Sequence, residues 1–450
     1  MKDSKAPKTP PESFECRIEK MVFGGWGLTH HQGKAVFVSN VAADETVEAR
    51  IYKKAKGVRY AELNNVVTAN ANARTSKKCQ HAGLCGGCTY QHLTQDYQLK
   101  IKLNILAETF HHKAEIGETI VSPRQFNYRN KMEYGFTRPP GGEITYGLHP
   151  RGRFRHIIDL QECHLINPDL WQTGQTIKRL IRENFSNDTT GERGDWQHLT
   201  MRQAFHDGST LIMLEVEDPQ SDKVRLLAEK IKQTCPTVVG IAAKKRHGQP
   251  SPVLGLDYLE EVIGTSKLRF HAENFFQVNV SILPSLITEI AKLVTPIAPK
   301  VLYDLFSGVG LFGVALAPHL SKDISIIAAE SDTRAAAIAR DNAARNGLTN
   351  YQSQAMDLYQ KGWGSQLRSN KSPSVAIIDP PRAGLAQKTV DEIGALAPDR
   401  IVYVSCNPTT QKRDIDWLER FGYKLGGVRL IDMFPQTYHL ESLAWLDKSS

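Results

Sequence analysis

The sequence lacks any apolar stretch that approaches the roughly 18 residues from which a transmembrane helix is recognised. Residues 1–11 are polar and rich in Lys and Pro, and they lack the apolar core of a secretory signal peptide. Only seven cysteines occur among 450 residues, and an odd number in a long chain argues against a framework of disulfides. We therefore expect a cytoplasmic protein with no membrane segment, whose cysteines bind a metal or act in catalysis.

The composition is that of a large folded protein with a basic excess. Hydrophobic residues make up 41% of the chain, and a length of 450 residues is enough for about three domains of typical size. The formal net charge is +8. This excess favours a polyanionic partner such as a nucleic acid, although many soluble proteins are mildly basic.

Residues 12–70 have the pattern of a small β module. Short alternating apolar runs at 36–38, 47–51 and 60–63 are separated by glycine-rich turns, which is typical of a small barrel. Tyr52 and Tyr60 lie among basic residues, namely Lys53, Lys54, Lys56 and Arg59. Such a strip could bind RNA, with cations on phosphates and aromatic rings on bases, or it could be a solvated charged hairpin.

A group of cysteines follows the β module. Cys79, Cys85 and Cys88 are separated by five and two residues, with glycines between them, and Cys163 is a candidate fourth member. Glycines allow the backbone to fold tightly enough for several thiolates to converge. A site made only of thiolates favours zinc or an iron–sulfur cluster, and the spacing does not choose between them.

The remainder of the first 270 residues is less informative. Residues 91–112 carry apolar side chains at helical spacing, and we expect this helix to pack in the core, against the domain formed by residues 271–450. Residues 128–131 and 149–156 interleave cations with aromatics, as an RNA-binding face or a solvated surface would. Predicted helices at 176–185 and 223–234 and strands at 211–216 and 238–243 indicate an α+β region.

Residues 271–450 alternate strands with helices. Apolar runs at 301–306, 324–329, 375–378 and 401–404 predict a doubly wound α/β domain with a mostly parallel sheet. Gly308, Gly310 and Gly313 form a G-x-G-x-x-G turn after the first strand, and Glu330 ends the next strand, where a ribose could be bound. This fingerprint alone would also permit an NAD-dependent oxidoreductase.

Residues beyond this fingerprint favour S-adenosylmethionine. Asp379 opens Asp-Pro-Pro-Arg after the third run, and Cys406 stands at the end of the fourth, where Asn407-Pro408 stops the strand. Ligands bind at this edge of open α/β sheets. A lone cysteine is more often a buried structural residue, and a lone glutamate such as Glu441 is more often a surface residue. Their context therefore has to decide their roles.

That context resembles the RNA 5-methyluridine methyltransferase family, of the TrmA and RumA/RlmD type. The resemblance is carried, in order along the chain, by Phe-Phe-Gln-x-Asn at 275–279, the turn at 304–310, Asp-Pro-Pro-Arg at 379–382, Ser-Cys-Asn-Pro at 405–408 and Pro-x-Thr-x-His-x-Glu at 435–441. With the cysteine group and the β module, which resembles the TRAM module, it covers nearly the whole chain. The complete arrangement resembles most the enzymes that act on 23S rRNA.

The resemblance implies three domains. These are an OB-like TRAM barrel at 12–70, an α+β central domain at 71–270, and a Rossmann-like class I methyltransferase domain, dependent on S-adenosylmethionine, at 271–450. In the central domain a [4Fe–4S] cluster would be held by the four cysteines, Cys79, Cys85, Cys88 and Cys163.

The resemblance also implies the chemistry. Cys406 would be the nucleophile that adds to carbon 6 of a uridine in 23S rRNA, and Glu441 the base that completes methylation at carbon 5. The positions that match cofactor-binding residues are Gln277, Phe306, Glu330, Asp357 and Asp379. No obligate protein partner is implied.

Two departures from the family pattern leave the RNA target open. Leu311 replaces an asparagine found in the RumA type, and Ser307 replaces a cysteine often seen there. The alternatives are the same chemistry on tRNA, a non-catalytic RNA-binding factor, and the NAD-dependent oxidoreductase.

Overall fold

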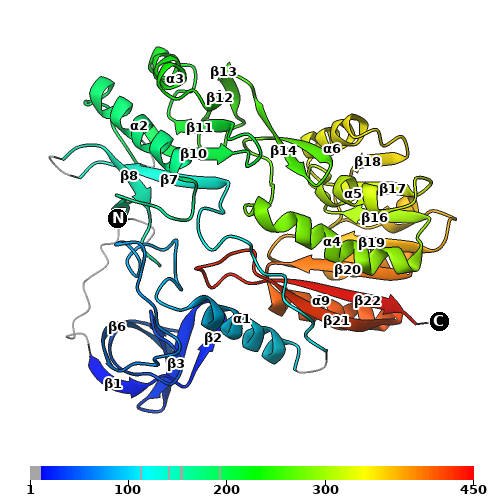
Figure 1. The fold of residues 1–450 in the computed structure, drawn as a ribbon, viewed down its shortest axis with the longest axis horizontal. Coiled ribbons are helices and arrows are strands. Elements are labelled where there is room, and N and C mark those ends of the chain that lie inside the picture. Colours follow the sequence, from blue (N-terminus) through cyan, green and yellow to red (C-terminus); the bar gives the residue numbers. More distant parts are fainter. Residues whose placement is uncertain (1–11, 112–113, 140–141, 153–155, 192–193, 450) are drawn as a thin grey trace.

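The computed structural model describes residues 12–111, 114–139, 142–152, 156–191 and 194–449. The expectations for residues 1–11 and for Arg153, Phe154 and Arg155 lie outside these residues. All seven cysteines are described, and all seven are free. Three large sheets follow one another along the chain, drawn from blue through green to red in Figure 1.

The first sheet is six-stranded, in the order β1-β5-β6-β4-β3-β2, and it curls around its own core in Figure 1. Period-two burial along β5 places Val47, Ala49 and Ile51 inside and polar neighbours outside. Lys56 (φ 50°) and Gly57 (φ 81°) form the tight turn to β6, where both residues need left-handed backbone. The strands are β1 (Ser13–Arg17), β2 (Lys20–Val22), β3 (Trp26–His31), β4 (Lys34–Ser39), β5 (Thr46–Ala55) and β6 (Val58–Thr68).

The second sheet is seven-stranded and carries α2 (Pro168–Asn184) and α3 (Asp222–Thr234). Helix α2 begins two turns before the predicted start at 176, because Asn167 caps it by accepting a hydrogen bond from the Asp169 N–H and Pro168 occupies its first position. The strands, in sheet order, are β13 (Ser251–Gly255), β12 (Val238–Lys244), β11 (Thr210–Val216), β10 (Trp196–Gln203), β7 (Lys131–Thr137), β8 (Thr145–Leu148) and β9 (Ile158–Asp159).

The third sheet is also seven-stranded, and its first five strands are parallel. The strands, in sheet order, are β18 (Tyr351–Ala355), β17 (Ser325–Glu330), β16 (Val301–Leu305), β19 (Ser374–Ile378), β20 (Arg400–Ser405), β22 (Glu441–Lys448) and β21 (Tyr423–Ile431). Strand β22 runs antiparallel to both of its neighbours. The predicted doubly wound α/β fold is confirmed.

Helices cover both faces of this sheet, so its strands are buried on both sides and read as continuous apolar runs. In β16, for example, Tyr303 packs into one apolar cluster and Leu302 into the other. The helices are α4 (Leu283–Val294), α5 (Leu311–Leu316), α6 (Thr333–Arg345), α7 (Trp363–Leu367), α8 (Gln387–Leu396) and α9 (Pro408–Leu418). A separate hairpin of β14 (Tyr258–Ile263) and β15 (Ser266–His271) precedes them.

One segment corrects the expectation about apolar stretches. Residues 280–297, which include α4, reach 18 residues at a mean hydropathy of 1.4, enough to span a membrane by length and composition alone. Half of this segment is buried in the protein, and the apolar stripe of α4, which includes Leu286 and Ile290, packs into the core of the third sheet. A core helix accounts for the hydropathy.

Helix α1 (Gln95–Thr109) joins the first sheet to the last. It lies between the curled sheet and the strands β21 and β22 in Figure 1, and it contacts β2, β21 and α9. Leu106 and Phe110 belong to one apolar cluster that also contains Val38 of β4 and Tyr423 of β21. The first and the third sheet therefore share a continuous core through α1.

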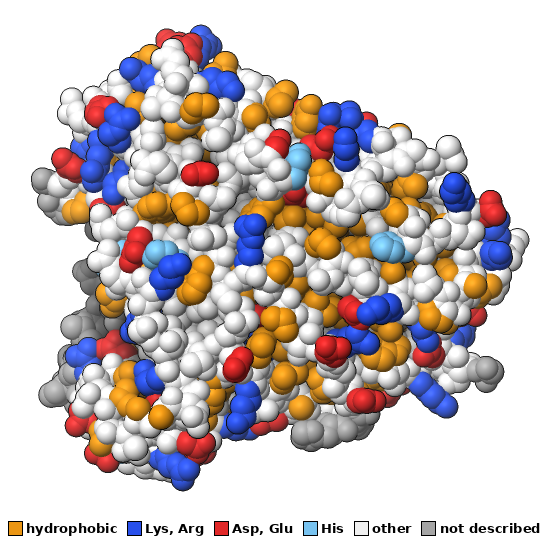
Figure 2. Space-filling view, viewed as in Figure 1, with side chains coloured by type: hydrophobic (Ala, Val, Ile, Leu, Met, Phe, Trp, Pro, Cys, Tyr) orange, Lys and Arg blue, Asp and Glu red, His pale blue; other side chains and the backbone are white. Residues whose placement is uncertain are grey.

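The charge of the chain is spread out on the face drawn in Figure 2. Lys and Arg side chains are interspersed with Asp and Glu over all three sheets, without forming a single basic block. The net charge of +8 therefore does not identify an RNA-binding surface on this face.

Candidate active site

The predicted site residues meet at the carboxyl edge of the third sheet. Phe306, Asp379 and Cys406 each directly follow a parallel strand, namely β16, β19 and β20, and Glu330 is the last residue of β17. Phe306 has a positive φ of 61°, uncommon for a bulky residue, as the chain leaves the strand for the glycine turn. This edge is where open α/β sheets bind their ligands.

The glycine turn is built for close approach. Gly310 has φ 85°, and a Cβ added there would lie 2.8 Å from the Tyr351 hydroxyl. The N–H of Gly313 donates to Asp304 Oδ2 at 2.8 Å, which ties the start of α5 to β16. Burial raises the pKa of Asp304 to about 7. Only glycine at these positions leaves the turn open above the strand.

Glu330 and Asp357 offer carboxylates at the neighbouring strand ends. Glu330 Oε2 accepts from the Gly308 N–H at 3.0 Å, and Oε1 accepts from the Asp332 N–H at 2.8 Å. Asp357 is exposed, two residues beyond β18. Its pKa is lowered by hydrogen bonds from the Gln360 side chain and then from the Tyr359 N–H. Both carboxylates are held by backbone and can accept hydrogen bonds from ligand hydroxyls or amines.

Gln277 reaches the site from outside the sheet. Its Nε2 donates to Asp379 Oδ2 at 3.3 Å, and its own carbonyl accepts from Asn130 Nδ2 at 3.2 Å. Burial raises the pKa of Asp379, the nearby Asp304 raises it further, and the Gln277 hydrogen bond opposes both. The loop after β15 thus closes over the end of β19.

The strand register brings Cys406 and Glu441 together. The last antiparallel pair of β20 and β22 is Ser405 with Ser442, so Cys406 and Glu441 are the residues directly beyond that pair on their two segments. They are close enough for the charge of Glu441 to raise the pKa of the Cys406 thiol. Ser442 fastens this end of the ladder, because its hydroxyl donates to the Ser405 carbonyl at 3.3 Å and to Gln411 Oε1 at 2.7 Å. Residues that are 35 positions apart in the sequence therefore lie near each other at the sheet edge.

Glu441 is buried, and one of its two carboxyl oxygens lacks a partner among the described residues. It is 3% exposed, and its Oε2 finds no hydrogen-bond partner among the described residues. Burial raises the pKa of this carboxyl, and Asp379 raises it further. A buried acid left in this state is costly for folding, and such groups gather at functional sites.

Cys406 is half-buried and protonated in the free site. Burial raises the pKa of its thiol to about 11, the charges of Glu441 and Asp379 act in the same direction, and Arg382 acts against them. Asn407 fixes the turn by donating from Nδ2 to the Arg382 carbonyl at 3.1 Å. The thiol thus stands between two carboxyls and one cation at an accessible edge.

His439 borders the same site. Burial lowers its pKa to about 4, and the positive charge of Arg129 lowers it further. Its ring lies 4.2 Å from the Tyr438 ring and 5.6 Å from the Phe434 ring, measured between centroids. The imidazole is therefore neutral near pH 7 and packs as part of an aromatic wall.

The four predicted cysteines gather in one place. Cys79, Cys85, Cys88 and Cys163 line a single small pocket. The loop can fold so tightly because Gly86 lacks a side chain: a Cβ there would lie 2.9 Å from the His149 carbonyl oxygen. Among the described residues no group of three or more metal-binding side chains has the spacing to hold an ion. The donor chemistry fits a thiolate-bound metal centre, but the side chains do not stand in ligand geometry.

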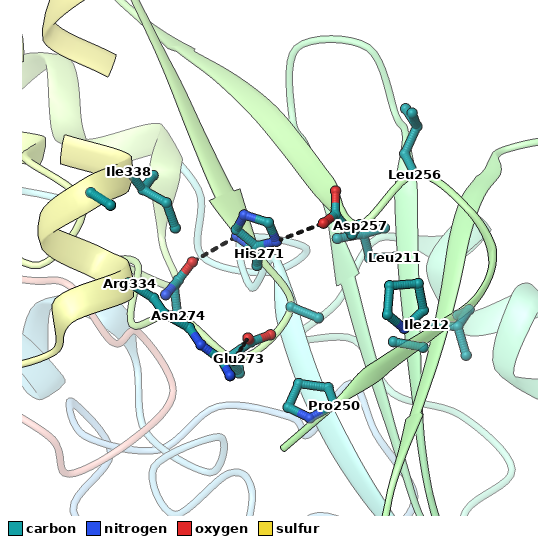
Figure 3. A pocket seen from close by; sticks show the side chains of 14 residues that line it. Leu211, Ile212, Pro250, Leu256, Asp257, His271, Glu273, Asn274, Arg334 and Ile338 are labelled. Carbon is teal, nitrogen blue, oxygen red and sulfur yellow. Dashed lines mark hydrogen bonds and ion pairs between the residues drawn. The ribbon is translucent and has the colours of Figure 1, made fainter. Parts of the chain in front are cut away.

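A different pocket lies between α6 and the strands β11 and β12, and Figure 3 shows its side chains. His271 Nδ1 lies 3.5 Å from Asp257 Oδ2, and the His271 N–H donates to Asn274 Oδ1 at 2.8 Å. On the opposite side Arg334 of α6 pairs with Glu273 at 3.6 Å. Neither Cys406 nor Glu441 lines this pocket, so we place the candidate active site at the sheet edge.

The segment at 128–131 is not the open RNA-binding face that its composition suggests. Tyr128 and Asn130 are fully buried, and the Tyr128 hydroxyl donates to the Pro435 carbonyl at 2.9 Å. Arg129 lies over the Phe434 ring at 5.9 Å. The segment instead supports the loop that leads to Glu441.

The fold and the site define a class I methyltransferase. The tRNA (uracil-54, C5)-methyltransferase of Pyrococcus abyssi, solved with S-adenosyl-L-homocysteine, shares the fold with a TM-score of 0.74 at 22% identity, over 96% of this chain and 99% of its own. The sequence model of the tRNA (uracil-5-)-methyltransferase family matches residues 210–449.

Two relatives extend the similarity along the whole chain. A protein of Caldanaerobacter subterraneus, named as an uncharacterized RNA methyltransferase, is 31% identical over 97% of this chain and 99% of its own length. The 23S rRNA (uracil(1939)-C(5))-methyltransferase RlmD of Marinomonas is 29% identical over 98% of this chain and 96% of its own. The chain belongs to the tRNA (uracil-5-)-methyltransferase family.

Proposed function

We propose that this protein methylates carbon 5 of a uridine in 23S rRNA, with S-adenosylmethionine as methyl donor and a covalent adduct on Cys406. The observation that carries the proposal is the end of the β20–β22 ladder, where Cys406 and the buried Glu441 directly follow the Ser405–Ser442 pair. Glu441 Oε2 has no hydrogen-bond partner among the described residues. The similarity to the Marinomonas enzyme over the whole chain supports the rRNA target.

The sheet edge suits the cofactor. Gly308 leaves room above β16, since a Cβ added there would meet no atom within 4 Å, and φ is positive at both Gly308 and Gly310. In this proposal Phe306, Glu330 and Asp357 bind the nucleoside part, and Gln277 and Asp379 lie nearer the reacting groups. When bound, S-adenosylmethionine supplies the methyl group.

Cys406 and Glu441 then act in turn. The Cys406 thiol first releases its proton to solvent, and the thiolate adds to carbon 6 of the uracil. The electron pair of the 5,6 double bond moves to carbon 5, which takes the methyl group as S-adenosylhomocysteine leaves. Glu441 removes the proton that carbon 5 still carries. The bond between carbon 6 and sulfur breaks, the double bond forms again, and Cys406 leaves as thiolate. A base of raised pKa suits this proton transfer.

The target base has to leave any stack to reach this edge. The adduct can then be trapped with RNA that contains 5-fluorouridine, because fluorine at carbon 5 cannot be removed as a proton. With S-adenosylmethionine present, we expect a protein–RNA band that survives denaturing electrophoresis. Cys406→Ala should give no such band, and a band of equal intensity from that variant would refute the assignment of the nucleophile.

We also propose that Cys79, Cys85, Cys88 and Cys163 hold a [4Fe–4S] cluster, supported by the common pocket that they line. Anaerobic purification should give about four irons and four sulfides per chain with absorption near the visible range typical of such clusters. Stoichiometric zinc without sulfide would refute the iron–sulfur cluster and would support a zinc site at the same four cysteines. The cluster has no step in the cycle above.

The target and the setting complete the proposal. The Pyrococcus abyssi protein is named for tRNA, so the same chemistry on tRNA is the alternative, and trapping with 23S rRNA and tRNA transcripts side by side distinguishes them. We propose that residues 12–70 are a TRAM-like RNA-binding module, followed by a central domain at 71–270 and the methyltransferase domain at 271–450, in a cytoplasmic enzyme. Exposed Tyr52, and Lys53 at 5.3 Å from the Tyr60 ring centroid, support the first of these roles.

A further inference from the structure

The loop between β21 and β22, residues 432–440, is held from outside the third sheet. It leads directly into Glu441, so its position sets where that carboxyl lies. Gln436 in its middle has φ 66°, a left-handed conformation that is uncommon for a residue other than glycine. Such a conformation persists only where the surroundings impose it.

The first set of contacts comes from the residues that follow Cys88. The N–H groups of Thr89 and Tyr90 both donate to the Gln436 carbonyl, at 3.1 Å and 3.0 Å. The Thr89 hydroxyl accepts from the Tyr438 N–H at 2.9 Å. Thr89 and Tyr90 are buried, so these bonds are shielded from water. Thr89 directly follows Cys88, so it connects the pocket lined by the four cysteines to the loop.

Helix α1 provides the second set. Gln98 Oε1 accepts from the Gln436 N–H at 2.9 Å, so both backbone groups of the strained residue are held. Lys102 Nζ donates to Asp432 Oδ1 at 2.8 Å and to the Phe434 carbonyl at 3.0 Å. Gln98, Lys102 and Asp432 are all at most 3% exposed.

Two further bonds close the loop from the other side. The Tyr128 hydroxyl donates to the Pro435 carbonyl at 2.9 Å, and Asn279 Nδ2 donates to the Met433 carbonyl at 3.1 Å. The loop is thus fixed at successive residues by partners that lie more than 150 positions away in the sequence. No partner of this kind is needed merely to connect two antiparallel strands.

We propose that Thr89, Gln98 and Lys102 form a clamp on the loop 432–440 that positions Glu441 for proton removal, and that the cysteine pocket acts in the reaction through this clamp. The inference rests on the base role proposed for Glu441. It gives the proposed metal centre a function without a chemical step. A centre bound by the four cysteines would order Thr89 and Tyr90, and these residues would order Gln436 and Tyr438.

The first test follows the loop itself and needs no activity. Thr89→Val removes the acceptor for Tyr438 while keeping both backbone donors, and Gln98→Met removes the acceptor for Gln436. The hydrogen-exchange rate, measured at residue resolution, should rise at least tenfold at the backbone amides of Gln436 and Tyr438 in each variant. This includes the amide whose own hydrogen-bond partner is intact. Lys100→Met, an exposed change on the same helix, should leave exchange unchanged. An increase confined to the amide that lost its partner would overturn the clamp.

The metal centre is tested with the same readout. Cys88→Ala, and wild-type protein treated with chelator under air, should raise exchange at Gln436 and Tyr438 as Thr89→Val does. Unchanged exchange in both preparations would separate the cysteine pocket from the loop and overturn that half of the inference.

The second test identifies the step that the clamp serves. In Thr89→Val and Gln98→Met, we expect the affinity for S-adenosylmethionine to stay within twofold of wild type and kcat to fall at least tenfold. Methylated RNA joined to the protein should accumulate, because proton removal follows methyl transfer and releases Cys406. A fall in kcat without accumulated adduct would show that the clamp does not act on the base. If wild type itself transfers no methyl group, the proposed function fails, and hydrogen exchange still decides the clamp.

Discussion

Glu441→Gln should stabilise the protein while stopping its turnover. Glu441 is 3% exposed, and its Oε2 has no hydrogen-bond partner among the described residues. Burial, with a further contribution from Asp379, raises the pKa of the carboxyl from 4.5 to about 8. Gln has nearly the same shape and no charge to bury.

The sign and size of the effect follow from linkage. The unfolded chain releases the Glu441 proton near pH 4.5, and the folded protein keeps it to about pH 8. Between these values the free energy of unfolding falls by about 1.4 kcal/mol per pH unit on account of this group. At pH 7 the ionisable carboxyl therefore costs on the order of 3 kcal/mol relative to a neutral isostere.

The assay compares urea unfolding of wild type and Glu441→Gln at pH 5, 6, 7 and 8. We expect the urea midpoint of Glu441→Gln to lie above that of wild type, by a difference that increases up to pH 8. We also expect this variant to show no catalytic turnover in a methyl-transfer assay. Glu419→Gln, an exposed change, should track wild type. A gap that does not change with pH would refute the reasoning, since the effect would then be unrelated to ionisation of Glu441.

Three further predictions concern the surroundings of the site. Lys102→Met should lower the free energy of unfolding by about 3–5 kcal/mol, because it leaves Asp432 buried and unpaired. Adding Asp432→Leu should recover most of that loss in urea titrations. No recovery would mean that the pair itself is strongly favourable. Glu330→Ala should raise the Kd for S-adenosylmethionine, measured by calorimetry, at least tenfold. The reason is that a hydrogen bond to a charged group contributes roughly 1.5–3 kcal/mol. An unchanged Kd would exclude Glu330 from the cofactor site. Gly427→Ala should lower the thermal midpoint, because its Cβ would overlap the Trp445 ring and overpacking costs about 1–3 kcal/mol; an unchanged midpoint would show that the ring can move aside.

The buried parallel strands could be predicted from the sequence because they are apolar on both faces. β19 and β20 lie within one residue of the predicted runs at 375–378 and 401–404. β21 was not predicted, since Gly426 and Gly427 interrupt its apolar pattern. In the fold these glycines lie at a bulge beneath the Trp445 ring, where a side chain would not fit. The two glycines that interrupt the apolar pattern are therefore required by the packing of the Trp445 ring in the folded protein.

The candidate site also has features that local sequence motifs predict and features that depend on contacts between distant residues. Motifs on one strand end, such as Cys406, could be found because strand and stop signal are adjacent in the sequence. The clamp could not, because Gln98 and Lys102 read as ordinary polar positions of an amphipathic helix, and their partners lie 338 and 330 residues away. Tyr128 misled the prediction, because an aromatic beside cations has the composition of an RNA-binding face whether it is exposed or buried.

The most direct test of the central claim is transfer of labelled methyl from S-adenosylmethionine to unmodified total RNA, separated by size and digested to nucleosides, with Cys406→Ala as control. We predict label in 5-methyluridine from 23S rRNA, and none with the variant. Label in tRNA would contradict the rRNA target and keep the chemistry. Label in another nucleoside, or undiminished transfer by Cys406→Ala, would contradict the mechanism.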